Sequence, residues 1–210
     1  MVSVSRQHRR LVAAAGIGAV VFIALTVAVG TNSSLGIDAR AFTTAHDLQA
    51  SWLTHAARII TSFGLIAIVG PALLVGGALL TRSGRRVHAA ALVSGGALTW
   101  LLVWIIKAAV DRPRPPAPLI NTTGQSFPSG HAANSVGWLA LGIAVAVLIP
   151  TRGGRVAAIT IGAALTILIG LSRIYLRAHF ASDVLAGEAL AAAVYAIAAL
   201  VFGRRVIRIG

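Results

Sequence analysis

The chain has 210 residues, of which 57% are hydrophobic and 11% are charged, and its mean hydropathy is +0.87. A soluble domain carries about 25% charged residues, so this composition excludes an ordinary water-soluble globule and indicates an integral membrane protein. The absence of cysteine excludes disulfide frameworks, iron–sulfur clusters, thiolate zinc sites and a cysteine nucleophile. The formal charge of +13 points to an acidic partner such as nucleic acid or a membrane surface.

Six apolar segments are long enough, or nearly so, to cross a bilayer as helices, which takes roughly 20 residues. They are residues 11–30, 59–80, 88–106, 132–150, 156–172 and 184–203. The first is too long for the apolar region of a signal peptide, so we expect a retained span. The fifth is short, so we expect its ends near the interface or in space lined by protein. The sequence predicts an all-α, six-helix membrane bundle formed by one domain, residues 1–210.

The distribution of arginine predicts the orientation of this bundle, because basic residues stay on the cytoplasmic side. One side carries eleven arginines and no acidic residue: Arg6, Arg9, Arg10, Arg82, Arg85, Arg86, Arg152, Arg155, Arg204, Arg205 and Arg208. We therefore expect both termini in the cytoplasm. These arginines are divided among separate segments and form no single basic patch, so a nucleic-acid partner is not expected.

Two longer connections lie on the opposite, outer side. Residues 32–58 mix polar and apolar side chains and predict an interfacial helix leading into the second span. Residues 112–128 contain five prolines and predict an irregular loop.

Three polar segments stand where predicted spans meet the outer interface: residues 107–115, 128–131 and 172–183. Ionisable side chains there are costly and call for a functional reason. Five cations suited to phosphate oxygens could reach this rim: Lys107, Arg112, Arg114, Arg173 and Arg177. Ser129 is suited to cap the helix of the fourth span, and Gly130 lets an anion approach the backbone N–H groups at its start.

Two histidines and one aspartate complete this set. His179 and Asp183 are four residues apart, and they share one face of a helix if the helix of the sixth span starts early enough. An aspartate bonded to one ring nitrogen would orient the imidazole and leave the other nitrogen free to attack. His131 is then a candidate proton donor. The pattern predicts a phosphoryl-transfer site that uses no metal and no other cofactor.

At these residues the sequence resembles the type 2 phosphatidic acid phosphatase superfamily, in its membrane branch. Three motifs carry the resemblance: KxxxxxxRP at Lys107, Arg114 and Pro115; PSGH at residues 128–131; and SRxxxxxHxxxD at Ser172, Arg173, His179 and Asp183. Every fixed position matches, in the same order. The first hundred residues carry little of the resemblance.

The resemblance implies a two-step mechanism. His179 would attack phosphorus and become a phosphohistidine, Asp183 would orient it, and His131 would protonate the leaving group before water releases phosphate. The residues implied to hold the phosphoryl oxygens are Lys107, Arg114, Ser129, Gly130 and Arg173.

Several other polar residues have simpler interpretations. Arg112 and Arg177 occupy variable positions of the motifs, where contact with substrate and snorkelling to headgroups both stay open. Asp111 could pair with one of them. For Glu188 we favour a role in packing or at a helix start.

His46 and His55 lie nine residues apart on the outer segment. They could suggest a metal site, but we favour a solvated interfacial helix.

The leading hypothesis is a lipid phosphate phosphatase at the outer face of a bacterial plasma membrane. Polyprenyl diphosphate is the first-choice substrate, with phosphatidylglycerophosphate and phosphatidate as alternatives. A phosphotransferase would use the same phosphohistidine. A non-catalytic lipid-phosphate binder or flippase would be expected to have lost His131 or His179, and both are present. The lipid tail, the number of phosphates and the oligomeric state stay open.

Overall fold

The protein is described by a computed structural model over residues 2–31 and 35–207. Over these residues the secondary structure is helical, with eight α-helices, one 3₁₀ helix and no strand. In chain order the helices are α1 (Val2–Thr31), α2 (Gly36–Asp47), α3 (Ser51–Ser62), α4 (Ile66–Arg82), α5 (Arg86–Val110), α6 (Gly130–Val145), η1 (Ala146–Leu148), α7 (Arg152–Tyr175) and α8 (Ala181–Ile207).

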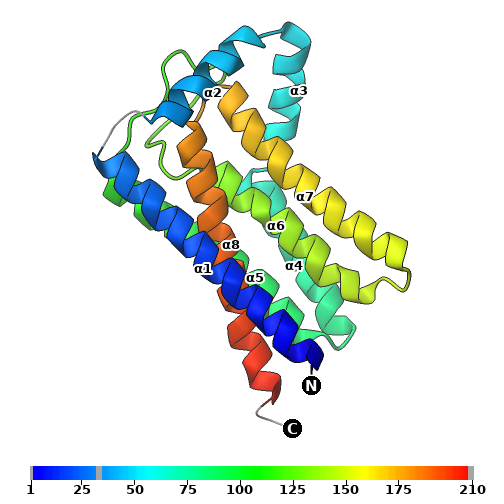
Figure 1. Ribbon diagram of the computed structural model, residues 1–210. Helices are drawn as coiled ribbons and strands as arrows, with labels where there is room; N and C mark the ends of the chain where they lie inside the picture. The colour runs from blue at the N-terminus through cyan, green and yellow to red at the C-terminus, as the bar shows by residue number, and fades with distance from the viewer. Residues whose placement is uncertain (1, 32–34, 208–210) are drawn as a thin grey trace.

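Helix α8 occupies the middle of the bundle, where it packs against α1, α5 and α6, while α6 also packs along α7 (Figure 1). The start of α1 and the end of α8 lie at the same end of the bundle. Helices α2 and α3 cover the opposite end, next to the end of α7 and the start of α8 (Figure 1). Two residues named above, Arg208 among the arginines expected in the cytoplasm and Asn32 at the start of the outer connection, lie outside the described residues, as do the side chains of Arg204 and Arg205.

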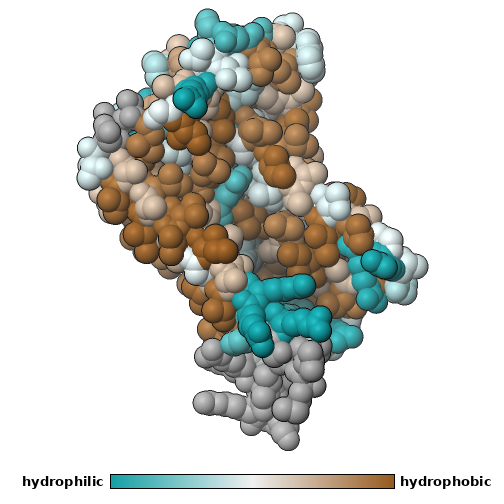
Figure 2. Space-filling model, in the orientation of Figure 1, coloured by the Kyte–Doolittle hydropathy of each residue, from teal (hydrophilic) through white to brown (hydrophobic). Residues whose placement is uncertain are grey.

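The prediction of a helical membrane protein is confirmed. Five helical segments in the described ranges are long and apolar enough to cross a membrane: Arg6–Thr31, Arg86–Val110, Gly130–Leu148, Arg152–Tyr175 and Ala181–Gly203. The surface agrees with this, because hydrophobic side chains cover most of the middle of the visible face and hydrophilic ones gather toward its ends (Figure 2). On α1, for example, Ile17 and Val20 are each 66% exposed.

The predicted second span, residues 59–80, is wrong as one continuous helix. It is divided into the end of α3 and the whole of α4, which meet at an angle of 46°, so the number of spans is five, or six if this bent pair counts as one. The break is stabilised by α6, where Trp138 Nε1 donates to Phe63 O at 2.8 Å and Asn134 Nδ2 donates to Gly64 O at 3.3 Å. A Cβ atom on Gly64 would lie 2.8 Å from Ile169 Cγ2, so a larger residue there would force Ile169 to shift.

Two further expectations need correction. The outer connection forms two helices, α2 and α3, and not one, because the Tyr175 hydroxyl binds the backbone of Ala50 between them at 3.1 Å. The fifth span is not short: α7 has 24 residues. Its last turn, with Ser172, Arg173 and Tyr175, is buried in protein, which agrees with the expectation of an end in space lined by protein.

Three apolar clusters hold the membrane-spanning part together. One joins α4, α5 and α6 around Leu80 and Leu92, a second joins α5, α6 and α8 around Ala133 and Leu190, and a third joins α1 and α8 to the 111–129 loop through Phe127. The third cluster anchors the loop that carries part of the candidate site.

Candidate active site

The segment between α5 and α6 is an irregular loop, as predicted, and Arg114 holds it closed. Its Nε donates to Gly124 O at 2.9 Å and its Nη2 donates to Thr123 O at 2.7 Å. Ser126 adds two hydrogen bonds to the beginning of the loop: its N–H donates to Arg112 O at 2.8 Å and its hydroxyl donates to Pro113 O at 2.9 Å. The loop therefore has a defined shape where it meets the ends of α7 and α8.

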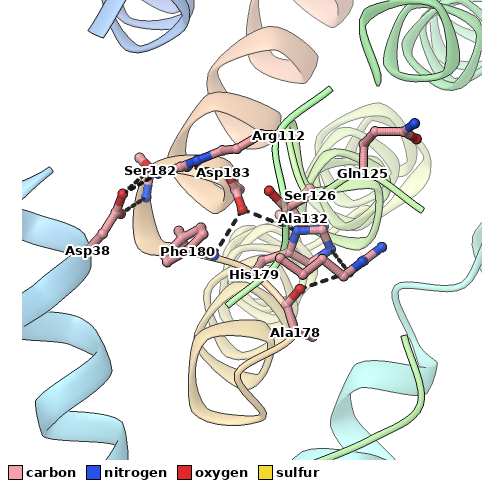
Figure 3. A network of polar contacts seen from close by, with 12 residues as sticks. Asp38, Arg112, Gln125, Ser126, Ala132, Ala178, His179, Phe180, Ser182 and Asp183 are labelled. Atoms are coloured by element: carbon pink, nitrogen blue, oxygen red, sulfur yellow. Dashed lines mark hydrogen bonds and ion pairs between the residues drawn. The ribbon is translucent and has the colours of Figure 1, made fainter. Parts of the chain in front are cut away.

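His179 lies two residues before α8 and Asp183 lies in its first turn, and they face each other, with His179 Nδ1 3.5 Å from Asp183 Oδ2. The same carboxylate oxygen accepts the Phe180 N–H at 2.9 Å, in the manner of an acidic residue in the first helical turn that satisfies a free backbone donor. This bond fixes the aspartate toward the imidazole (Figure 3). The condition for a shared helical face is not met, because α8 begins at Ala181 and His179 precedes it, but the two side chains face each other all the same.

The second ring nitrogen of His179 identifies its tautomer. Arg114 Nη1 lies 3.3 Å from His179 Nε2 and also donates to Ala178 O at 2.8 Å. A guanidinium can only donate hydrogen bonds, so Nε2 is the acceptor and the ring proton resides on Nδ1, toward Asp183. Nε2 therefore carries the lone pair that a nucleophile needs.

Burial also keeps this imidazole neutral. His179 is only 3% exposed, and desolvation lowers its pKa to about 4, against the opposing effect of Asp183. The neutral, nucleophilic form is thus the main form at neutral pH.

The three motif segments converge on this histidine. His131, at the start of α6, lies within the electrostatic reach of four charged or titratable motif residues: Arg173, His179, Arg114 and Lys107. Gly64, at the break between α3 and α4, packs against the Cβ of His131. The two histidines predicted to act together therefore lie in one site.

Three cations near His179 have neutral acceptors. Lys107 Nζ donates to Gln125 O at 2.6 Å, and Arg173 Nη1 donates to Thr61 Oγ1 at 2.9 Å. Arg114 binds backbone oxygens, and burial lowers the pKa of its guanidinium. Among the described residues, no carboxylate lies within ion-pair distance of these three side chains. Arg173 is buried and the other two are half-buried, and cations removed from water without counter-ions favour an anionic ligand.

The start of α6 has the predicted cap. Ser129 is fully buried and its side chain accepts the Ala132 N–H at 3.4 Å. Its own N–H donates to Asp183 O at 2.9 Å, which joins this segment to α8. The Ser129 N–H is consequently occupied. Gly130, the next residue in the chain, is the first residue of α6.

Arg112 neither snorkels nor lies free for a ligand. It is 4% exposed and lies between two carboxylates, with Nη2 2.7 Å from Asp38 Oδ2 and Nη1 2.5 Å from Asp183 Oδ1. Asp38 is the residue that the sequence reasoning missed. It stands in the first turn of α2, far along the chain from its partners, so no motif spacing marks it; the only signal was that the chain has five acidic residues in all.

Arg177 is also buried, at 7% exposure, and it fastens the end of α7 to α2. Its Nη2 lies 2.9 Å from both His46 Nδ1 and Gln49 Oε1. Asp111 pairs with neither arginine in the described contacts and instead accepts Gln125 Nε2 at 3.2 Å.

Glu188 is half-buried on α8 and packs against Gly170 of α7, as expected. His46 and His55 lie exposed on different helices, α2 and α3, not on one. No group of three or more His, Cys, Asp or Glu side chains that could hold a metal occurs in the described part of the chain.

Comparison with known families identifies the family of the chain. The PAP2 superfamily matches residues 88–207, more than half of the sequence. The chain belongs to the PAP2 superfamily. This confirms the resemblance found in the three motifs and makes the chain a lipid phosphate phosphatase of the PAP2 type, a hydrolase. The matched residues include all of the candidate site except Asp38, which lies outside them.

This chain is similar to bacterial membrane phosphatases. It is 27% identical over 173 residues to phosphatidylglycerophosphatase B of Bacillus subtilis, covering 80% of this chain and 85% of that one. Its fold matches the crystal structure of a transmembrane PAP2 type phosphatidylglycerolphosphate phosphatase from Bacillus subtilis, with a TM-score of 0.79, 24% identity, and 90% and 96% of the two chains covered. Aquifex aeolicus LpxE is similar with a TM-score of 0.61, 20% identity, and 81% and 97% covered.

Proposed function

We propose that this PAP2 phosphatase hydrolyses a lipid phosphate through a phosphohistidine formed at His179 Nε2. One observation carries the proposal: Nε2 presents its lone pair beside three cations that have no carboxylate partner among the described residues. A nucleophile in a cationic, desolvated site suits attack on a phosphate, whose negative charge would otherwise repel it.

The proposed reaction has two steps. His179 Nε2 forms a bond to phosphorus while the bond from phosphorus to the leaving oxygen breaks, and His131 transfers a proton to that oxygen. Asp183 stabilises the positive charge that develops on the imidazole, whose Nδ1 keeps its proton. Water then attacks phosphorus and gives a proton to His131, the bond from phosphorus to Nε2 breaks, and His179 and inorganic phosphate are released.

The phosphoryl oxygens are held by residues of all three motifs: Lys107, Arg114, Gly130, Arg173, and Ser129 through its hydroxyl, since the Ser129 N–H is bound to Asp183 O. Support for the cationic members comes from their neutral acceptors, because a carbonyl or hydroxyl leaves their charge available to substrate. Support for Gly130 comes from its place at the start of α6, where backbone N–H groups favour anions.

As substrate we place phosphatidylglycerophosphate first, because the curated relative is named a phosphatidylglycerophosphatase. Polyprenyl diphosphate, the first choice from the sequence, and phosphatidate stay as candidates for the same site. A panel of the three lipids in detergent, assayed side by side for phosphate release, ranks them.

The active site is proposed to face the outside of a bacterial plasma membrane. The basic turns at residues 82–86 and 152–155 and the start of α1 belong to the end of the bundle remote from His179 (Figure 1). The positive-inside rule places that end in the cytoplasm.

The test of the chemistry is phosphate release from phosphatidylglycerophosphate by purified protein in detergent with EDTA present. Wild-type activity should persist, and His179→Ala should lower it by about 1,000-fold or more, because loss of a nucleophile leaves only binding and charge stabilisation. His55→Ala, which removes an exposed histidine on α3, is the matched control and should retain activity. Loss of wild-type activity in EDTA, or full activity of His179→Ala, would contradict the proposal. Transfer of label to a second lipid in place of water would indicate a phosphotransferase.

A further inference from the structure

Asp38 is a buried carboxylate that belongs to none of the three motifs. It is 2% exposed, and its two oxygens accept three hydrogen bonds from two residues that lie beside the candidate nucleophile. Ser182 donates its N–H to Oδ1 at 2.8 Å and its hydroxyl to Oδ2 at 2.7 Å. Arg112 Nη2 donates to Oδ2 at 2.7 Å.

Arg112 connects Asp38 to the site (Figure 3). Its guanidinium binds Asp38 on one side and Asp183 and Ser182 on the other, and it lies 4.2 Å from the centre of the Phe180 ring. These contacts fix both the position and the charge environment of the aspartate that faces His179. Helix α2 thereby reaches the catalytic centre without touching its reacting atoms.

The charges of this group explain why a second carboxylate is needed. A buried ion pair between Arg112 and Asp183 alone has a net charge of zero. The positive guanidinium then cancels most of the electrostatic stabilisation that Asp183 would give to a positively charged imidazole. Asp38 adds a negative charge on the other side of the guanidinium. The group of Asp38, Arg112 and Asp183 then has a net charge of −1, which can stabilise the positive imidazole that forms as His179 bonds to phosphorus.

We propose that Asp38 is a positioning residue for the reaction: it offsets the charge of Arg112, so that Asp183 keeps its full effect on His179. This inference rests on the proposed phosphohistidine function. It assigns a role to α2, a helix outside the matched family region.

The test compares four proteins in detergent micelles with phosphatidylglycerophosphate as the probe: wild type, Asp38→Asn, Arg112→Gln and the double variant. Asp38→Asn leaves a neutral pair and should lower kcat by about 10- to 100-fold with KM within about threefold, because Asp38 does not touch substrate. The double variant removes both charges, returns the group to −1 and should recover at least about fivefold in kcat over Asp38→Asn. A purely structural role for Asp38 predicts no such recovery, since two disruptions of one network do not restore its geometry.

Two controls separate the possible failures. Asp47→Asn makes the same change at an exposed position of α2 and should leave kcat unchanged. If Asp38→Asn does not accumulate in the membrane, Asp38→Glu keeps the charge and should retain kcat within about tenfold.

The inference is overturned if Asp38→Asn keeps full kcat, if the double variant is no more active than Asp38→Asn, or if Asp38→Glu is as inactive as His179→Ala. An active wild type with any of these results leaves the proposed function intact. A wild type that is inactive on phosphatidylglycerophosphate, polyprenyl diphosphate and phosphatidate alike overturns both.

Discussion

Among the cations at the site end of the bundle, the partner of each side chain separates the roles. Arg114 binds backbone oxygens, Arg112 binds two carboxylates, and Arg177 binds neutral side chains of α2. An arginine whose charge is already balanced adds little attraction for a phosphate, whereas one held by carbonyl groups keeps its charge for a ligand. Residue type and spacing are alike for Arg112 and Arg114, so only these partners distinguish them.

The low pKa of His179 gives a prediction about acid stability. With a pKa near 6.5 in the unfolded chain and about 4 in the folded protein, the unfolded state binds the proton first as the pH falls. His179 therefore has no effect on stability above pH 6.5 and destabilises the fold progressively between pH 6.5 and 4, by roughly 2 kcal/mol at pH 5.

Thermal unfolding in detergent at pH 7 and pH 5 measures this effect. His179→Asn removes the titrating group and should lose less stability between the two pH values than the wild type. His55→Asn, at an exposed position, should follow the wild type. Equal losses in wild type and His179→Asn would contradict the assigned pKa.

At the scale of elements, the contact between α6 and α8 brings two motifs together. A Cβ atom on Gly187 would lie 2.5 Å from Ser129 O. This distance is too short for a contact between a side-chain carbon and a backbone oxygen. Gly187 follows Asp183 by one helical turn, so this close approach determines how near the start of α6, with His131, comes to the start of α8.

Gly187→Ala should therefore separate the motifs. We expect about 1–3 kcal/mol of destabilisation from overpacking and a loss of kcat/KM of about tenfold, as His131 moves away from the leaving group. The measurements are melting temperature and phosphate release. Gly203→Ala changes a glycine of the same helix with open space around it and should leave both unchanged. A Gly187→Ala protein as stable and active as the wild type would show that the contact is not needed.

At the scale of the whole molecule, the basic turns and the candidate site lie at opposite ends of the bundle. The basic turns belong to the end where α1 begins and α8 ends, and the candidate site belongs to the other, under α2 and α3 (Figure 1). A lipid phosphate in the outer leaflet would reach such a site with its headgroup at the level of the Arg114 loop.

Single cysteines test this orientation, because the chain has none of its own. Asn121→Cys lies exposed in the loop of the site end, and Ser83→Cys lies exposed in the turn between α4 and α5. In intact cells a membrane-impermeant thiol reagent should label Asn121→Cys and should label Ser83→Cys only after the membrane is opened. Labelling in the reverse order would mean that the site faces the cytoplasm.

The sequence alone determined the membrane class and most of the spans. Hydropathy is a local property, and it holds whatever the rest of the chain does. Only the tertiary structure decided the break between α3 and α4, where side chains of α6 bind the carbonyl groups of Phe63 and Gly64. It alone also showed Asp38, whose partners Arg112 and Ser182 lie 74 and 144 residues away, because no local spacing records a contact between helices so far apart in the chain.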